Sequence, residues 1–363
     1  MKMIFKILFT SIVLSPFYTF GQDYNVGEQT IIYTDSLRNR MIKTEIWYPT
    51  NETDSTFERK TDLPFVLSPT IRNAKITNQV FPLVVLSHGT GGNRFGLAWL
   101  AIALVKQGYI VISPDHWGNT FDNKIPEYFV RYWERPMDIS FLLTHFLNDK
   151  PFSQQIDTSR IGMVGFSFGG YTSLALAGAD LNCDLLKTIS KTEQGKKEFS
   201  IPELGDLRKL VDKIPCENIH NTFKDNRIKA FVALAPALGL GFDNMGQTKY
   251  LTAPILIIGA ENNRIAPIKS NAENYNKLIP HSLFIKLEGK IGHYVFINEG
   301  DESLKKEART YYKDDKAINR KTIHRNVEKE IITFFQNTMN KYAYRITYKT
   351  ISYTKKRRII CYI

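Results

Sequence analysis

The chain has 363 residues, of which 43% are hydrophobic and 23% are charged. This length and apolar content suffice for one large globular domain, with or without an insertion. The formal charge of +12 is concentrated at the two ends, in Lys2 and Lys6 and in seven basic residues within 341–363, so that residues 22–340 carry only +3. A nearly neutral body argues against a nucleic-acid-binding protein.

Residues 1–21 have the pattern of a secretory signal peptide, in which a positively charged start precedes an apolar run. The run has about 14 residues and contains Pro16, so it is shorter than the ~20 residues of a membrane span. We therefore expect cleavage near Gly21, export of the chain, and no stable membrane span. Export permits disulfides, and Cys183 and Cys216 flank one irregular region in which they could pair. Neither a CxxC motif nor a Cys/His cluster with zinc spacing is present, so we expect no metal site.

Buried strands alternate with helices along most of the chain. The segments 26–33 and 40–48 first predict an antiparallel pair. Continuous apolar strands separated by helical segments then predict a mostly parallel sheet with helices on both faces, an α/β class. The predicted strands begin at 82 and cover 109–115, 160–165, 228–236, 253–260 and 282–289, and the predicted helices cover 94–107, 131–149, 171–178 and 325–339.

One segment breaks this alternation. Residues 179–227 are polar and charged, and we interpret them as an inserted cap within a single domain at 22–340. The basic tail at 341–363 mixes aromatic and charged residues, and we expect a poorly ordered end.

The sequence RIGMVGFSFGG (160–170) carries the strongest functional signal. Ser167 lies between Gly165 and Gly169, at the junction of a predicted strand and a predicted helix. This is the pattern of the nucleophile elbow of serine hydrolases, a sharp turn that exposes the serine hydroxyl. The two glycines keep the backbone free of side chains where strand and helix cross. A GxSxG sequence also occurs by chance in ordinary turns, but its strand–helix context favours the nucleophile.

A serine nucleophile needs a base and a third group that orients the base. In the hydrolase order the acid follows the serine and the histidine comes last. His293 follows the last predicted strand in a Gly-rich loop and is the expected base, whereas His324 begins the terminal helix. For the acid we expect Glu261, with Asn263 and then Asp243 as alternatives.

Asn263 stands four residues before a proline, where such loops usually carry aspartate. An asparagine can orient an imidazole, but it supplies no negative charge to stabilise the imidazolium.

The oxyanion hole requires two backbone N–H groups. We expect one from Phe168, directly after the nucleophile, and one from Thr90 in the Gly-rich loop 88–92. That loop lacks the Lys-Ser/Thr ending of a phosphate-binding P-loop, and we expect no cofactor.

Together these residues resemble the α/β-hydrolase superfamily, and within it the branch of predicted dienelactone hydrolases and plasma-type platelet-activating-factor acetylhydrolases. The resemblance spans roughly 80–300. It implies the α/β-hydrolase fold, Ser167 as nucleophile, His293 as base, and Thr90 and Phe168 as oxyanion donors. The segments that carry it are PLVVLSHGTGGNRFG (82–96), GYIVISPDHWGNTF (108–121), RPMDISFLL (135–143), RIGMVGFSFGG (160–170), VALAPALG (232–239) and IGHYVF (291–296). A serine instead of a cysteine nucleophile argues against dienelactone hydrolysis itself.

The expected function is that of an exported serine hydrolase that cleaves short-chain or phospholipid-like acyl esters through an acyl-enzyme. An amidase or peptidase on the same fold is the first alternative. A ligand-binding pseudo-enzyme is the second, and Asn263 is the residue that supports it.

Overall fold

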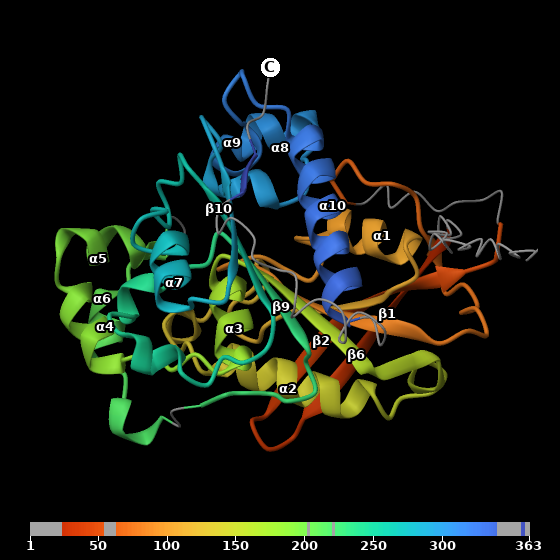
Figure 1. Ribbon diagram of the computed structural model, residues 1–363, viewed down its shortest axis with the longest axis horizontal. Helices are drawn as coiled ribbons and strands as arrows, with labels where there is room; N and C mark the ends of the chain where they lie inside the picture. The colour runs from red at the N-terminus through yellow and green to blue at the C-terminus, as the bar shows by residue number, and fades with distance from the viewer. Residues whose placement is uncertain (1–23, 54–62, 202–203, 220–221, 340–356, 360–363) are drawn as a thin grey trace, which may run out of the picture.

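The computed structural model describes residues 24–53, 63–201, 204–219 and 222–339, and the backbone of 357–359. The segment expected to be a signal peptide, 1–21, lies outside the described residues, as does most of the basic tail. Within the described part, a ten-stranded sheet has the order β12-β11-β10-β9-β6-β4-β5-β2-β1-β3, and a two-stranded sheet pairs β7 with β8. Figure 1 shows strands of the large sheet, among them β6, β9 and β10, in the middle of the molecule.

The strands of the large sheet confirm each strand predicted from the sequence. They are β1 (Asn25–Asp35), β2 (Arg40–Thr50), β3 (Ile71–Arg72), β4 (Phe81–Ser87), β5 (Ile110–Pro114), β6 (Ile156–Phe166), β9 (Ala230–Leu234), β10 (Ile255–Ala260), β11 (Leu283–Leu287) and β12 (Arg357–Ile359), and the small sheet consists of β7 (Ser200–Ile201) and β8 (Gly205–Asp206).

The centre of the sheet is parallel. The strands β5, β4, β6, β9, β10 and β11 run in one direction, whereas β1 and β2 form the predicted antiparallel pair and β2 joins β5 antiparallel. The carboxyl ends of the parallel strands therefore share one edge, where loops can bring residues from distant parts of the sequence together. The mostly parallel sheet predicted from the sequence is confirmed.

The helices connect these strands. The α-helices are α1 (Ala98–Lys106), α2 (Glu134–Phe146), α3 (Phe168–Ala177), α4 (Cys183–Ser190), α5 (Glu193–Glu198), α6 (Arg208–Asp212), α7 (Ala272–Leu278), α8 (Glu302–Glu307), α9 (Arg309–Tyr312) and α10 (Arg320–Met339). Short 3-10 helices cover Pro126–Phe129, Phe152–Gln155, Cys216–Asn218, Gly239–Gly241, Met245–Thr248 and His293–Phe296.

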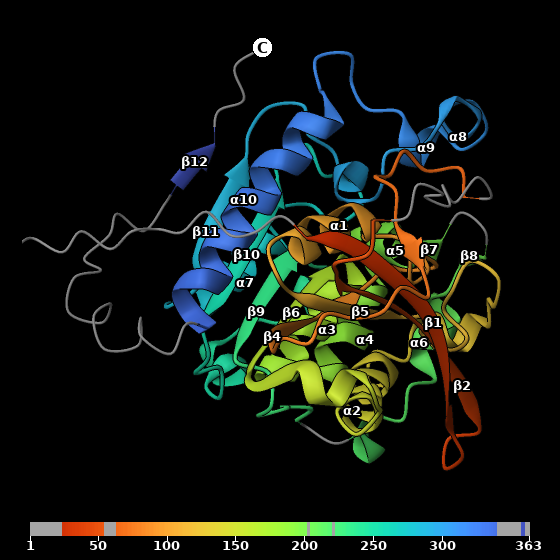
Figure 2. The ribbon, with the colours of Figure 1, turned by 90° about the vertical axis from the view of Figure 1, so that its right-hand side faces the viewer.

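The helices cover both faces of the sheet, as predicted. Figure 2 shows α1 and α10 on one side of the sheet and α2 and α3 on the other. The strand β4 supplies both layers, because alternate side chains of a strand point to opposite faces. Leu83 and Val85 belong to the hydrophobic cluster that contains α2 and α3, and Val84 and Leu86 belong to the cluster that contains α1 and α10.

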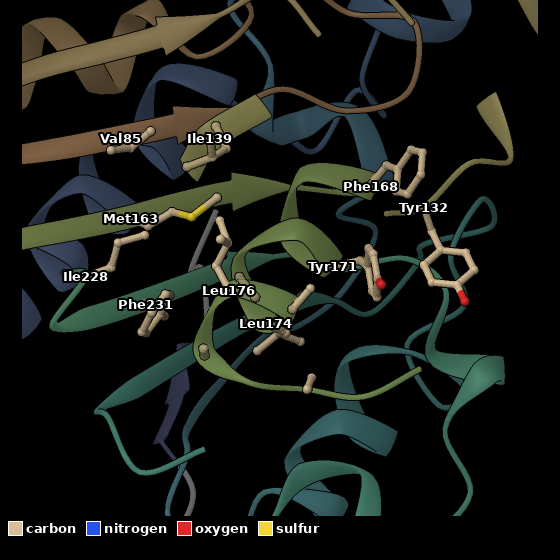
Figure 3. Close-up of a cluster of buried hydrophobic side chains, with 14 of the residues drawn as sticks. Val85, Tyr132, Ile139, Met163, Phe168, Tyr171, Leu174, Leu176, Ile228 and Phe231 are labelled. Carbon is tan, nitrogen blue, oxygen red and sulfur yellow. The ribbon is translucent and has the colours of Figure 1, made fainter. Parts of the chain in front are cut away.

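Helix α3 is enclosed by the first of these clusters. Every residue from Phe168 to Ala177 is buried. Figure 3 shows Met163 of β6 and Ile139 of α2 in the same layer as the apolar side chains of α3. The ring of Tyr171 meets that of Tyr132 edge-on, with centroids 6.0 Å apart. Helix α3, which follows the elbow, is therefore fixed by packing along its whole length.

The segment predicted as a cap, 179–227, separates α3 from β9. It contains α4, α5, the small sheet and α6, and its three helices gather at one side of the molecule (Figure 1). Cys183 and Cys216 form a disulfide across 33 residues of it. Its interpretation as a cap stays a prediction.

Several details differ from the sequence prediction. The predicted helix 94–107 begins only at Ala98, because residues 94–97 form turns. Helix α7 was not predicted, because it is short and contains two asparagines, which favour helices weakly. In the tail, Arg357–Ile359 pair in parallel with Ile285–Leu287 at the edge of the sheet. Among the described residues no helix is long and apolar enough to cross a membrane.

Candidate active site

The predicted elbow has a strained backbone at its centre. β6 ends at Phe166 and α3 begins at Phe168, and Ser167 between them has φ 56° and ψ −115°. A positive φ is costly for a residue with a side chain and persists only where the surroundings impose it. A Cβ added to Gly165 would overlap the carbonyl of Gly169, and a Cβ added to Gly169 would overlap the carbonyl of Ser87.

His293 lies against this serine. It opens the 3-10 helix after β11, and its Nε2 lies 3.0 Å from the Oγ of Ser167. Both residues are buried, at 6% exposure for the serine and 4% for the histidine. The structure thus brings the predicted nucleophile and the predicted base, 126 residues apart in sequence, within hydrogen-bond distance. A serine hydroxyl held by an imidazole is the geometry from which a base can take its proton.

The far side of the imidazole lacks a partner. The Nδ1 atom of His293 is buried, and no described residue forms a hydrogen bond with it. The ring lies instead beside the aromatic rings of Phe166 and Tyr294, with centroids 4.9 and 5.0 Å away. Burial lowers the pKa of His293 from 6.5 to about 3, because removal from water disfavours the charged form of the ring. The ring is therefore neutral near pH 7, the form in which it can accept the proton of Ser167.

Two of the predicted acids lie away from the base. The carboxylate of Glu261 lies 2.6 Å from the Nζ of Lys286 and accepts the N–H of Gly289 at 2.6 Å. Its side chain is 41% exposed, because the loop after β10 turns it toward the neighbouring strand β11. Asp243 is exposed and accepts from the side-chain amide of Asn244 at 2.7 Å. The structure therefore brings neither Glu261 nor Asp243 to His293.

Asn263, the third candidate, is 7% exposed. Its Oδ1 accepts the N–H groups of Ile265 and Ala266 at 3.1 and 2.8 Å, which folds the loop after β10. The N–H of Asn262 donates to the carbonyl of Ile291 at 3.0 Å, so this loop runs beside the one that carries the base. With its oxygen engaged by the backbone, the group left over on Asn263 is the side-chain NH2, a donor.

The expected oxyanion donors flank the serine. Phe168 is the first residue of α3, so its N–H has no acceptor within the helix. The loop 88–92 follows β4, and a Cβ on Gly89 would lie 3.3 Å from the Cβ of Ser167. No hydrogen bond engages the N–H of Thr90 or of Phe168 within the described part of the chain. Two unengaged donors beside the nucleophile can serve a developing oxyanion.

His324 has a supporting position. Its Nε2 lies 2.7 Å from the carbonyl of Val295, and its ring stacks on Trp99 at 3.9 Å between centroids. It thus steadies the segment that follows His293. In the described ranges no cluster of three or more His, Cys, Asp or Glu residues could hold a metal ion.

Sequence reasoning missed one group near the site. Arg135, Asn119 and His88 are buried and meet beneath the loop 88–92. His88 begins the Gly-rich loop, and Asn119 and Arg135 lie in segments that carry the resemblance, but the sequence does not reveal which of their side chains meet.

Comparisons with known proteins find distant relatives of this chain. A cutinase of Thermobifida alba is 24% identical over 207 residues, which cover 56% of this chain and 50% of the relative. A cutinase of Thermobifida cellulosilytica is 24% identical over 217 residues, 58% of this chain and 60% of the relative. The chain thus matches only half to three fifths of the length of these curated relatives. No protein-family model matches.

A solved structure extends the likeness over most of the chain. The ferulic acid esterase from Streptomyces cinnamoneus has a TM-score of 0.56 and 18% identity, and the superposition covers 87% of this chain and 90% of that chain. With its mostly parallel sheet, helices on both faces and strand–serine–helix turn, the chain has the α/β-hydrolase fold.

Proposed function

We propose that this protein is an exported serine hydrolase that cleaves carboxylic esters through an acyl-enzyme. The observation that carries the proposal is the buried hydrogen-bond contact between Ser167 and His293 at a strained strand–helix turn. Strain of this kind at a non-glycine residue is typical of functional sites. The names of the relatives, cutinase and ferulic acid esterase, support an ester substrate.

The reaction takes two steps. Ser167 Oγ attacks the ester carbonyl carbon while His293 Nε2 takes the hydroxyl proton, and the carbonyl oxygen becomes an oxyanion at the N–H groups of Thr90 and Phe168. The C–O bond to the alcohol then breaks, and His293 returns the proton to the leaving oxygen. In the second step His293 takes a proton from water, the hydroxide attacks the acyl-enzyme, and Ser167 leaves with that proton.

We further propose that Asn263 occupies the position of the third triad member, although no described residue, Asn263 included, hydrogen-bonds the Nδ1 of His293. Its loop lies beside that of the base, whereas Glu261 is engaged by Lys286. An amide in this position cannot stabilise the imidazolium by charge, so turnover is slower than with a carboxylate. This favours esters with good leaving groups over amides, whose amines leave less readily. Short-chain and phospholipid-like acyl esters are the substrate classes that we propose.

Export is supported by the disulfide between Cys183 and Cys216. Disulfides persist in oxidising compartments and are rare in the reducing cytosol. The pattern of residues 1–21 agrees with this proposal.

The test is hydrolysis of p-nitrophenyl acetate, butyrate and longer esters, with matched p-nitroanilides, by the native chain and by Ser167→Ala. The matched control is Ser173→Ala, a serine of the same helix whose buried hydroxyl has no hydrogen-bond partner among the described residues. We expect ester hydrolysis in the native chain and the control, and a loss of at least about 10³-fold in Ser167→Ala. Faster cleavage of the anilides would favour an amidase, and a folded but inactive native chain would favour a pseudo-enzyme.

A further inference from the structure

Arg135 is a buried residue whose guanidinium donates hydrogen bonds to the backbone of the loop 88–92. It lies in the first turn of α2 and is 1% exposed. Its Nη1 donates to the carbonyl of His88 at 2.5 Å, and its Nη2 donates to the carbonyl of Gly89 at 3.0 Å and to the Oδ1 of Asn119 at 3.1 Å. No carboxylate of the described chain lies within salt-bridge distance of its guanidinium. The nearby Asp138, one turn later in α2, pairs instead with Arg38 and His116. Burying a charge is costly, so this arrangement needs a reason.

The carbonyl of Gly89 belongs to the peptide unit whose N–H is that of Thr90. This bond is trans, because among the described residues only the bond before Pro151 is cis. In a planar trans peptide the C=O and the N–H point in opposite directions. The hydrogen bond from Arg135 to the Gly89 carbonyl therefore directs the N–H of Thr90 away from α2, and no described residue accepts that N–H.

Other donors hold the same carbonyl. The N–H of Gly92 donates to it at 3.1 Å, and the Nδ1 of His88 lies 2.7 Å from it. The Nε2 of His88 accepts the N–H of His116 at 3.3 Å, so its proton sits on Nδ1 and is donated to Gly89. Burial and the charge of Arg135 lower the pKa of His88 well below 6.5, which keeps its ring neutral.

Arg135 also reaches the second expected donor. Its guanidinium carbon lies 4.5 Å from the centroid of the Phe168 ring, a cation–π distance. Asn119, which it contacts, accepts the N–H of Gly91 at 2.8 Å, so the residues on both sides of Thr90 are fixed. One guanidinium thus contacts the Gly89–Thr90 peptide at its carbonyl and Phe168 at its ring, and both groups flank the candidate oxyanion hole.

We infer that Arg135 is a positioning residue that preorganises the oxyanion hole by fixing the Gly89–Thr90 peptide and by packing on Phe168. It does not touch the substrate. The inference rests on the proposed function, because it assigns a task within that hydrolysis. Preorganised donors stabilise charge without reorganisation during the reaction, so a loosened peptide lowers the rate more than it lowers binding of the uncharged ester.

The test compares the native chain with Arg135→Met, which removes the donors at similar size, and Arg135→Lys, which keeps the charge without the planar fork. Arg227→Met is the matched control, because Arg227 also binds α2, donating to Ser140 and Thr144 away from the site. Three quantities are measured: kcat and KM on p-nitrophenyl acetate, and the Ki of a boronic acid that forms a tetrahedral adduct with the serine.

In Arg135→Met we expect kcat to fall by about 10²-fold and the Ki of the boronic acid to rise by a similar factor, with KM within about 3-fold. Arg135→Lys should fall between native and Arg135→Met, and Arg227→Met should match the native chain. A folded Arg135→Met with native kcat and Ki, or with equal losses in Arg227→Met, would overturn the inference. If Arg135→Met does not fold, Asn119→Ala, which frees the N–H of Gly91, should show the same selective loss in smaller measure.

The proposed function and the inference can fail separately. A folded native chain that neither hydrolyses esters nor binds the boronic acid would contradict the proposed function. A crystal structure of Arg135→Met then decides the positioning claim, because we expect the Gly89 carbonyl to turn away from α2 while the loop in Arg227→Met keeps its conformation. An unchanged Gly89–Thr90 peptide in Arg135→Met would refute it.

Discussion

Replacing Asn263 by aspartate should make this chain a faster enzyme. In Asn263→Asp one carboxylate oxygen can keep the N–H groups of Ile265 and Ala266, and the other becomes an acceptor where the amide offered a donor. We expect that acceptor to pair with the Nδ1–H of His293, which has no partner among the described residues. Nδ1 protonation leaves Nε2 free to take the proton of Ser167.

The size of the effect follows from the pKa of the base. Burial lowers the pKa of His293 from 6.5 to about 3. The imidazolium that forms during attack is thus disfavoured by roughly 5 kcal/mol relative to water. A hydrogen bond to a charged partner restores about 1.5–3 kcal/mol of this. We therefore expect kcat in Asn263→Asp to rise by about 10- to 100-fold.

The assay is the pH dependence of kcat on p-nitrophenyl acetate. A carboxylate beside the ring raises the pKa of His293, so the acid limb of the profile should move to higher pH together with the gain in rate. Glu261→Gln is the matched control, and it should leave kcat within about 3-fold, because its carboxylate binds Lys286 at the surface. An unchanged rate in a folded Asn263→Asp, or a large loss in Glu261→Gln, would refute the reasoning.

Three further predictions concern stability. Cys183→Ser opens the 33-residue disulfide loop and should lower the free energy of unfolding by about 4 kcal/mol in urea titrations without reductant, whereas dithiothreitol should bring the native chain close to the variant. Gly165→Ala should abolish or severely impair folding in circular dichroism and expression tests, since its Cβ would overlap the Gly169 carbonyl; a native-like melting curve would contradict this. Because folding lowers the pKa of His293, the unfolded chain binds a proton at this residue more readily than the folded chain as pH falls from 6.5 toward 3, and the free energy of unfolding decreases over that window. Between pH 7 and 5 the free energy of unfolding of the native chain should fall by about 2 kcal/mol more than that of His293→Gln. Equal decreases in the two proteins would count against a buried neutral histidine.

The sequence predicted the frame of the site well because that frame is local. A run of apolar residues, two glycines around Ser167 and a helical run after it determine the strand, the turn and the helix. The position of His293 directly after β11 was likewise predictable, since parallel strands end at one edge of the sheet.

Side-chain partners were harder to predict. Glu261 lies two residues from Asn263, and the position of Glu261 in the sequence does not reveal that it forms an ion pair with Lys286 on the neighbouring strand. Arg135 lies on a helix about 30 residues before the nucleophile, and only the packed structure shows that its guanidinium meets the loop 88–92. Both depend on contacts between elements that are distant in sequence.

The central claim is that Ser167 is the nucleophile. Its most direct test is fluorophosphonate labelling of the folded native chain, read by intact mass and then by peptide mapping. We predict one adduct per chain, located on Ser167, and no adduct in His293→Ala under the same conditions. A folded chain that takes up no label, or takes it up at another residue, would contradict the claim.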